Sequence, residues 1–404
     1  MSVSSAPISR PGLITAVLAL LSVFPPIATD MYLSSMDDIA TALHATDTAA
    51  ELSLSLFFLG LCVGQLIMGP LIDGYGRKGP LLAGVLLFTL TSLALLVVRD
   101  AAIFNTLRFF QAIGACAGMV VGRAVVSDLY DGREAAKVLT LLVMLMTLGP
   151  ILSPFLGSLM AQALGWEAIF VTMVVVGLLA LGLTRVILPE TLPRDRRADR
   201  PFVTAFARMR VLLTRQAFIL PALAAGLIQA AMFAFITGSS GLFQGVFGLS
   251  SLAYGLLFAL IAAALMIAGK LNTWLLDRYA PTAIVAIALP LFAAAGAALV
   301  ALSGTSTLWV FVVPLWLAIG LVGLLSANVM AIAMEASPEG AGIGSAVLGG
   351  IQFAIAFLTS SAVALGGTDS ALPMSLAILV TGLAALGVWT LSQRRSAALP
   401  VAGE

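Results

Sequence analysis

The sequence contains twelve long apolar runs, each separated from the next by a polar segment. A helix needs roughly 20 predominantly apolar residues to cross the hydrocarbon core of a bilayer. The runs therefore predict an all-α membrane protein with twelve transmembrane helices. The predicted spans are 13–34, 48–69, 80–98, 101–129, 136–161, 166–187, 216–238, 250–272, 281–303, 307–333, 342–365 and 372–391. The first run lacks the short apolar region and cleavage site of a signal peptide, so we expect a retained span.

Composition supports the same class. Of 404 residues, 61% are hydrophobic and 10% are charged, whereas soluble proteins carry about 25% charged residues. The excess apolar surface must face lipid. The net charge of +1 gives no indication of a nucleic-acid partner. Cys62 and Cys116 both lie in apolar runs, so we expect no disulfide, no metal site and no cofactor.

Basic residues orient the predicted spans. One set of loops holds most of them, including Arg77, Lys78 and an arginine-rich segment at 188–215, whereas the opposite loops hold only Arg99. Cytoplasmic loops carry an excess of Lys and Arg. We therefore expect both termini in the cytoplasm of a bacterium and the spans in its inner membrane.

The polar segment at 188–215 divides the chain into two parts of similar length. We predict a six-helix bundle at 1–187, a cytoplasmic linker at 188–215 and a second six-helix bundle at 216–404. Two pseudo-symmetric halves are a common transporter architecture, with the substrate site between them.

Four motifs carry a family resemblance. The loop at 69–78 reads GPLIDGYGRK, with a shorter copy, DRY, at 277–279. The fourth span contains RFFQAIG at 108–114, and the fifth contains GPILSPFLGS at 149–158. The first span contains FPPIATDMYL at 24–33. Together they resemble the major facilitator superfamily, and the last resembles its bicyclomycin- and chloramphenicol-resistance branch of drug:proton antiporters. The resemblance covers nearly the whole chain.

The resemblance implies roles for these motifs. The loop pair would form a conformational gate; the alternative is a plain tight turn with exposed bases. Gly74 departs from the superfamily, which usually has a basic residue there. The fifth span would hold the antiporter motif. The gate residues are Asp73, Gly76, Arg77, Lys78, Asp277 and Arg278, and the antiporter motif residues are Gly149, Pro150, Pro154 and Gly157.

Ionisable residues inside spans usually mark function because they are costly at bilayer depth. Asp30 is the one acidic residue deep in a predicted span, and Arg108 lies at a similar depth in the fourth span. A nearby cation favours an ionised carboxylate, whereas burial favours the neutral acid. We hypothesise that Asp30 carries the proton and that Arg108 tunes it; the alternative is a static buried ion pair. Arg123 could face the cavity or pair with Asp128, and the sequence leaves both open.

The substrate cavity is expected to be apolar with a few amides, which suits a moderately hydrophobic drug. Its candidate lining residues are Tyr32, Gln229, Met232, Phe233, Phe235, Asn328, Met330, Gln352 and Phe353. The predicted function is proton-coupled efflux of drugs of the phenicol or bicyclomycin type by a monomer, with drug, protons and lipid as its partners. The alternative is export or facilitated transport of a small metabolite, such as an amino acid or sugar. An enzyme is not expected, because the single histidine, His44, lies in a loop and no catalytic constellation is found within the spans.

Overall fold

The computed structural model describes residues 11–130, 132–337, 341–367 and 369–398, and every regular secondary-structure element within these ranges is a helix. Twelve helical segments in this part of the chain are long and apolar enough to cross a membrane. The predicted all-α membrane protein with twelve spans is therefore confirmed.

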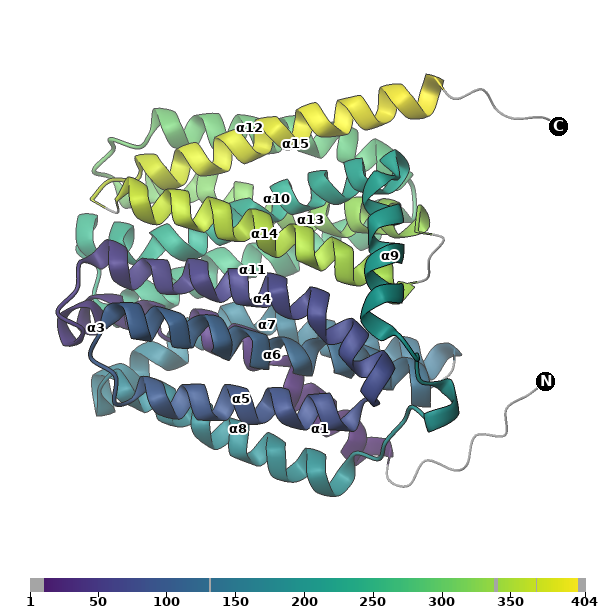
Figure 1. Ribbon diagram of the computed structural model, residues 1–404. Coiled ribbons are helices and arrows are strands. Elements are labelled where there is room, and N and C mark those ends of the chain that lie inside the picture. The colour runs from purple at the N-terminus through teal and green to yellow at the C-terminus, as the bar shows by residue number, and fades with distance from the viewer. Residues whose placement is uncertain (1–10, 131, 338–340, 368, 399–404) are drawn as a thin grey trace.

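We call the helices before the long polar segment the first half and those after it the second half. The first half comprises α1 Pro11–Ser22, α2 Phe24–Asp30, the 3-10 turn η1 Leu33–Ser35, α3 Met36–Ala42, α4 Asp47–Tyr75, α5 Lys78–Leu95, α6 Ala101–Leu129, α7 Gly132–Leu164 and α8 Glu167–Ile187. The second half comprises α10 Gln216–Ser240, the π-helical turn η3 Gly241–Val246, α11 Ser251–Leu276, α12 Pro281–Ala301, α13 Leu308–Glu335, α14 Ala341–Gly366 and α15 Leu372–Ala398. Figure 1 shows the two halves side by side; at their boundary α4 packs against α14, and α7 packs against α11.

The first span is broken, although its apolar run reads as one helix. Helix α1 ends at Ser22, and Pro25 and Pro26 open the short helix α2. Proline has no backbone N–H to continue an α-helical ladder, but it is tolerated in the first turn. Helix α2 ends at Asp30, before η1 and α3. Asp30 therefore lies at a break in the span, where the backbone is irregular.

The polar segment between the halves contains η2 Arg194–Arg196 and a helix, α9 Pro201–Thr214. Helix α9 lies across one end of the bundle, where it contacts α4 of the first half and α10 and α14 of the second (Figure 1). Met209 and Leu212 are its buried residues. The sequence did not predict α9, because its short apolar stripe lies among many arginines.

The bundle has two unlike ends. We call the end covered by α9 the α9 end; α1 begins and α15 ends there (Figure 1). At the opposite, far end the halves are joined by buried hydroxyl groups. Ser55 of α4 and Thr237 of α10 each share a hydrogen bond with Ser360 of α14, at 2.8 Å and 2.6 Å. We call these three residues the far-end seam.

Candidate functional site

A cavity of about 770 Å³ lies between the halves. Its wall is formed by residues of α1, α2, α4, α6, α7, α10, α11, α13 and α14. Most of the lining side chains are apolar, and Asp30 and Arg123 are the charged ones among the described residues. The site is therefore an apolar chamber with one acid and one base in its wall.

Asp30 lies in the wall of this cavity at the end of α2. The residue is 1% exposed, and its Oδ1 atom has no hydrogen-bond partner among the described residues. A buried polar atom without a partner is unusual in folded proteins and needs an explanation. A carboxyl group that exchanges a proton during a working cycle is one such explanation.

Arg108 is completely buried behind the wall of the cavity. Its guanidinium donates to the carbonyl oxygen of Ala28 at 2.6 Å and to the side-chain oxygen of Gln111. The rings of Tyr32 and Phe57 lie 4.4 Å and 4.5 Å from the guanidinium carbon. No ion pair joins Arg108 to Asp30 in the part of the chain described. Arg108 is instead bonded to the backbone of α2, and the predicted tuning of Asp30 by Arg108 stays a prediction.

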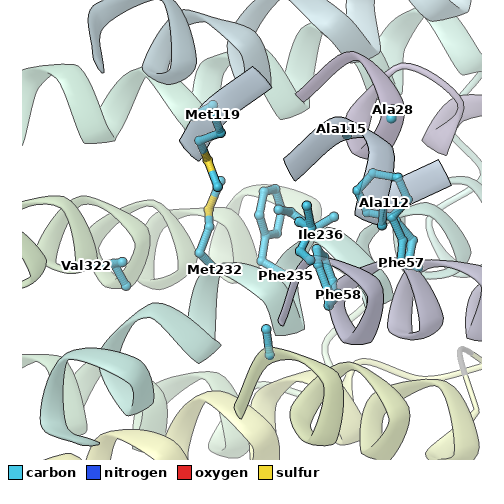
Figure 2. Close-up of a cluster of buried hydrophobic side chains, with 14 of the residues drawn as sticks. Ala28, Phe57, Phe58, Ala112, Ala115, Met119, Met232, Phe235, Ile236 and Val322 are labelled. Atoms are coloured by element: carbon cyan, nitrogen blue, oxygen red, sulfur yellow. The ribbon is translucent and has the colours of Figure 1, made fainter. Parts of the chain in front are cut away.

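The structure places four of the seven principal lining candidates on the cavity wall, namely Gln229, Met232, Phe233 and Met330, together with Gln352 and Phe353. Figure 2 shows Met232 of α10 pointing toward Met119 of α6 across the space between the halves. The Phe233 ring lies 4.5 Å from that of Phe58. Adaptable thioether and aromatic groups therefore face one another from both halves.

Three lining candidates lie elsewhere, and these assignments are corrected. The Tyr32 hydroxyl shares a 2.8 Å hydrogen bond with Ser53, and its ring stacks on Arg108. Phe235 stacks on Phe258 with a centroid distance of 4.7 Å. Asn328 donates to the side-chain oxygen of Asn272 at 2.7 Å. Each side chain is held by contacts outside the cavity, which one sequence could not reveal.

Arg123 faces the cavity and also lines a second hollow of about 660 Å³ at the α9 end, which we call the vestibule. Its Nη1 atom donates to Ser345 of α14 at 2.8 Å, across the boundary between the halves. Asp128 pairs with Arg77 instead, at 3.0 Å. Of the two roles considered for Arg123, the pair with Asp128 is therefore wrong.

The α4–α5 loop forms an ion-pair network at the α9 end. Arg77 pairs with Asp73 at 2.6 Å and with Asp128 of α6 at 3.0 Å. Gly76 ends α4 with a φ of 92°, in the left-handed region that glycine adopts without strain. Lys78 donates from its ammonium group to the carbonyl oxygen of Arg185 in α8 at 2.9 Å. The four gate candidates of the first half are therefore assembled at one place.

The polar segment after α8 binds the backbone of this loop through Glu190, a role that the sequence did not predict. Glu190 accepts hydrogen bonds from the backbone N–H groups of Arg77 at 2.7 Å and Lys78 at 3.2 Å. Partial burial raises the pKa of Glu190. The hydrogen bonds from these N–H groups and from that of Leu192, together with the charge of Arg197, lower the pKa by more than burial raises it, so the pKa lies below its usual value. The available signal was the sequence PETLP at 189–193, which opens the segment.

The copy of this loop in the second half has no such network. Asp277 and Arg278 are both exposed, and no ion pair involves either of them among the described residues. The Arg278 guanidinium stacks on the Trp274 ring at 4.2 Å. The predicted gate residues of the second half therefore do not form the kind of ion-pair network that the α4–α5 loop forms.

The antiporter motif of α7 packs against the broken first span. A Cβ atom at Gly149 would collide with the Pro26 ring, and one at Gly157 would collide with the carbonyl oxygen of Met31. Small residues allow such close helix approach in membranes. Pro150 and Pro154 lie inside α7, and Pro150 lines the cavity. The motif thus holds the segment that bears Asp30.

A second buried acid departs from the expectation that Asp30 stands alone. Glu51 lies in α4 and is 3% exposed. The predicted boundaries put it near the end of a span, where solvent contact is expected. The structure instead buries it within the bundle.

Comparisons with known proteins agree with the geometry. The sequence profile of the Major Facilitator Superfamily matches residues 18–361. A bicyclomycin resistance protein homolog of Haemophilus influenzae is 31% identical over 360 residues, covering 88% of this chain and 90% of that protein. A chloramphenicol resistance protein of Pseudomonas aeruginosa is 29% identical over 334 residues, covering 81% and 77%. The crystal structure of a D-xylose-proton symporter matches with a TM-score of 0.75 at 15% identity, covering 94% and 98%.

Proposed function

The chain belongs to the major facilitator superfamily, and from that premise we propose that it exports small, moderately hydrophobic drugs of the phenicol or bicyclomycin type in exchange for protons. It is a transporter and not an enzyme. The resistance proteins among its relatives support the drug class. Their similarity extends over most of the chain, so it covers both halves of the cavity wall.

One observation carries the proposal: a large apolar cavity in whose wall Asp30 is the single acid among the described residues. Hydrophobic and aromatic lining binds a moderately hydrophobic molecule without demanding one shape, and a few polar groups orient it. The polar groups here are Gln229 and Ser326, joined by a 3.0 Å hydrogen bond, and Gln352. A drug and a proton can therefore compete for one chamber.

Proton exchange follows from the position of Asp30. An ionised carboxylate at bilayer depth costs about 2.5–3.5 kcal/mol on insertion scales. When Asp30 binds a proton, the chamber has one charge fewer to solvate. When the proton has left to the water at the α9 end, the chamber can bind a new drug molecule. Exchange of protons for drug then needs only that the two halves rock around the cavity.

The proposed orientation in the membrane rests on the charges at the α9 end. This end carries Arg77, Lys78 and the arginines of the segment before and within α9. The excess of basic residues supports a cytoplasmic location for this end and for both termini, in a bacterial inner membrane. The far end then faces the periplasm. In this orientation the vestibule is the entry for drug from the cytoplasm.

Export of a small metabolite is the second candidate, and Arg123 is the observation that favours it. This cation lies where the vestibule meets the cavity and has only a neutral partner, Ser345, for its Nη1 atom. A substrate with a carboxylate would pair with it. A drug that is neutral but dipolar would accept a weaker hydrogen bond from the same guanidinium group.

Asp30→Asn in reconstituted vesicles tests the proposal. We expect drug-dependent proton uptake to fall at least about tenfold, equivalent to 1.4 kcal/mol in the barrier. The control is Asp369→Asn, which removes an exposed acid from the loop between α14 and α15. Unchanged coupled uptake in Asp30→Asn would rule out the proton role of Asp30. Failure of the wild-type protein to move chloramphenicol, florfenicol or bicyclomycin would favour the metabolite.

A further inference from the structure

The vestibule differs from the central cavity in the helices that form its wall. Residues of α4, α6, α7, α9, α13 and α14 enclose its volume of about 660 Å³, which is in the usual range for small-molecule sites. Among the described residues, those of α9 line the vestibule and not the central cavity. Much of the wall is apolar, and its larger apolar side chains include Ile72, Val120, Leu139, Met209, Met334 and Ile343. The vestibule can therefore enclose the apolar body of a ligand at a place of its own.

The charged groups that line the vestibule do not cancel. Three arginines and two aspartates line it among the described residues, so their charges sum to +1. Arg77 binds both acids, Asp73 at 2.6 Å and Asp128 at 3.0 Å. The other two arginines, Arg123 and Arg208, have no ion-pair partner in the part of the chain that is described. The vestibule therefore has an excess positive charge on these two side chains.

Arg123 and Arg208 reach the vestibule from different helices. Arg123 of α6 donates from Nη1 to Ser345 at 2.8 Å and from Nε to the carbonyl oxygen of Met119 at 3.3 Å. A guanidinium group has five N–H donors, so most of those of Arg123 remain for a ligand. Arg208 of α9 is exposed and has no hydrogen-bond or ion-pair partner among the described residues. Both guanidinium groups can therefore donate to an anion in the vestibule.

We propose that the vestibule is a second ligand site, which binds amphipathic organic anions of drug size that carry one acidic group. Arg123 and Arg208 donate charge-assisted hydrogen bonds to the acidic group, and the apolar wall packs against the rest of the molecule. One negative charge on the ligand neutralises the excess positive charge of a largely apolar hollow, where an uncompensated charge is costly. The same excess charge disfavours organic cations.

This site adds a ligand class to the proposed function and does not depend on drug:proton exchange. Arg123 lines both the vestibule and the central cavity, whereas Arg208 lines the vestibule alone. An anion whose binding depends on Arg208 therefore lies in the vestibule. An anion whose binding depends on Arg123 and not on Arg208 lies in the central cavity, as the second candidate function would have it.

Binding of 2-naphthoate to the purified full-length protein tests the site. This probe joins one carboxylate to an apolar double ring, and 2-naphthamide is its uncharged counterpart. Calorimetric titrations in a neutral detergent, with protein-free micelles as the blank, should show that naphthoate binds about tenfold more tightly than naphthamide, a difference of 1.4 kcal/mol. Arg123→Gln and Arg208→Gln should each weaken naphthoate binding about tenfold and leave naphthamide binding unchanged.

Arg210→Gln is the matched control. Arg210 is an exposed arginine two residues further along α9 that does not line the vestibule, so naphthoate binding should stay the same. Because Arg208 is itself exposed, Arg208→Gln removes no buried contact and should fold as the parent does. Equal naphthoate affinity in Arg208→Gln and the parent would overturn the proposal, and so would equal affinity of the parent for naphthoate and naphthamide.

A lipid headgroup is the other source of an anion at this end of the bundle. The titration is therefore repeated in nanodiscs of phosphatidylcholine, with and without phosphatidylglycerol, and naphthoate should bind in both. Loss of naphthoate binding only where phosphatidylglycerol is present would assign the arginines to lipid and overturn the proposal. Since the readout is equilibrium binding, a protein that fails to exchange drug for protons would still show the site, so the two failures are distinguishable.

Discussion

At the scale of single residues, the contacts of Arg108 depend on the planar shape of its guanidinium group and not on its charge alone. The planar guanidinium bonds Ala28 and Gln111 while two aromatic rings lie against its faces. A lysine ammonium is compact and cannot reproduce a planar group that is both stacked and doubly bonded. Arg108→Lys therefore keeps the charge but loses the geometry that orders the backbone beside Asp30.

We expect Arg108→Lys to lose at least one charge-assisted hydrogen bond, of about 1.5–3 kcal/mol. Purified protein in detergent should show a lower apparent melting temperature, and proteoliposomes should show slower transport. Arg278→Lys is the matched control, because Arg278 also stacks on an aromatic ring but is exposed. Equal stability of Arg108→Lys and wild type would contradict this account.

Sequence reading identifies the buried charges that interrupt apolar runs but not their partners. Asp30, Arg108 and Arg123 stand out because their neighbours along the chain are apolar. Glu51 was missed because it lies near the end of a predicted span, where solvent contact is expected. The partner of Arg123, Ser345, lies 222 residues later in the sequence. Contacts between the halves leave no local pattern, so one sequence cannot assign them.

At the scale of elements, α9 explains why Gly74 departs from the basic residue expected in the α4–α5 loop. A Cβ atom at Gly74 would collide with the ring of Pro201, the first residue of α9. The backbone N–H of Ala198 also donates to the carbonyl oxygen of Asp73 at 3.0 Å. The loop and the start of α9 are thus packed too closely for a side chain at position 74.

Gly74→Arg should displace α9 from the bundle. Trypsin cleavage at Arg208 and Arg210 requires local unfolding of α9, so its rate reports how often this helix detaches. We expect the rate to rise about tenfold, equivalent to 1.4 kcal/mol of docking free energy. Gly79→Arg is the control, since a Cβ atom there meets nothing within 4 Å. A cleavage rate in Gly74→Arg no higher than in Gly79→Arg would show that this contact does not hold α9.

The elements themselves were predicted with unequal success, for a physical reason. Each full span is marked by an apolar run, and lipid makes that requirement strict. The break in the first span and helix α9 were not predicted. Pro25 and Pro26 are compatible with a kinked continuous helix as well as with a broken one, and α9 buries only Met209 and Leu212. Short elements held by tertiary contacts carry too weak a local signal.

At the scale of the whole molecule, the two ends of the bundle differ in their access to water. The far-end seam is closed by Ser55, Thr237 and Ser360, all of them buried. The cavity and the vestibule share residues of both halves, among them Gln65 and Ser345. The structure therefore resembles one stage of an alternating-access cycle, closed at the far end and hollow toward the α9 end.

Labelling from each side of the membrane tests this stage and the orientation together. In a protein with both native cysteines changed to alanine, Ser345→Cys should react with an impermeant maleimide added to the cytoplasmic face of everted vesicles, because Ser345 lines the vestibule. Ser360→Cys should stay unlabelled from either face, because Ser360 is completely buried. Intact cells should protect Ser345→Cys from reagent added outside. Strong labelling of Ser345→Cys from the periplasm, with none from the cytoplasm, would invert the proposed orientation, since the α9 end would then face outward.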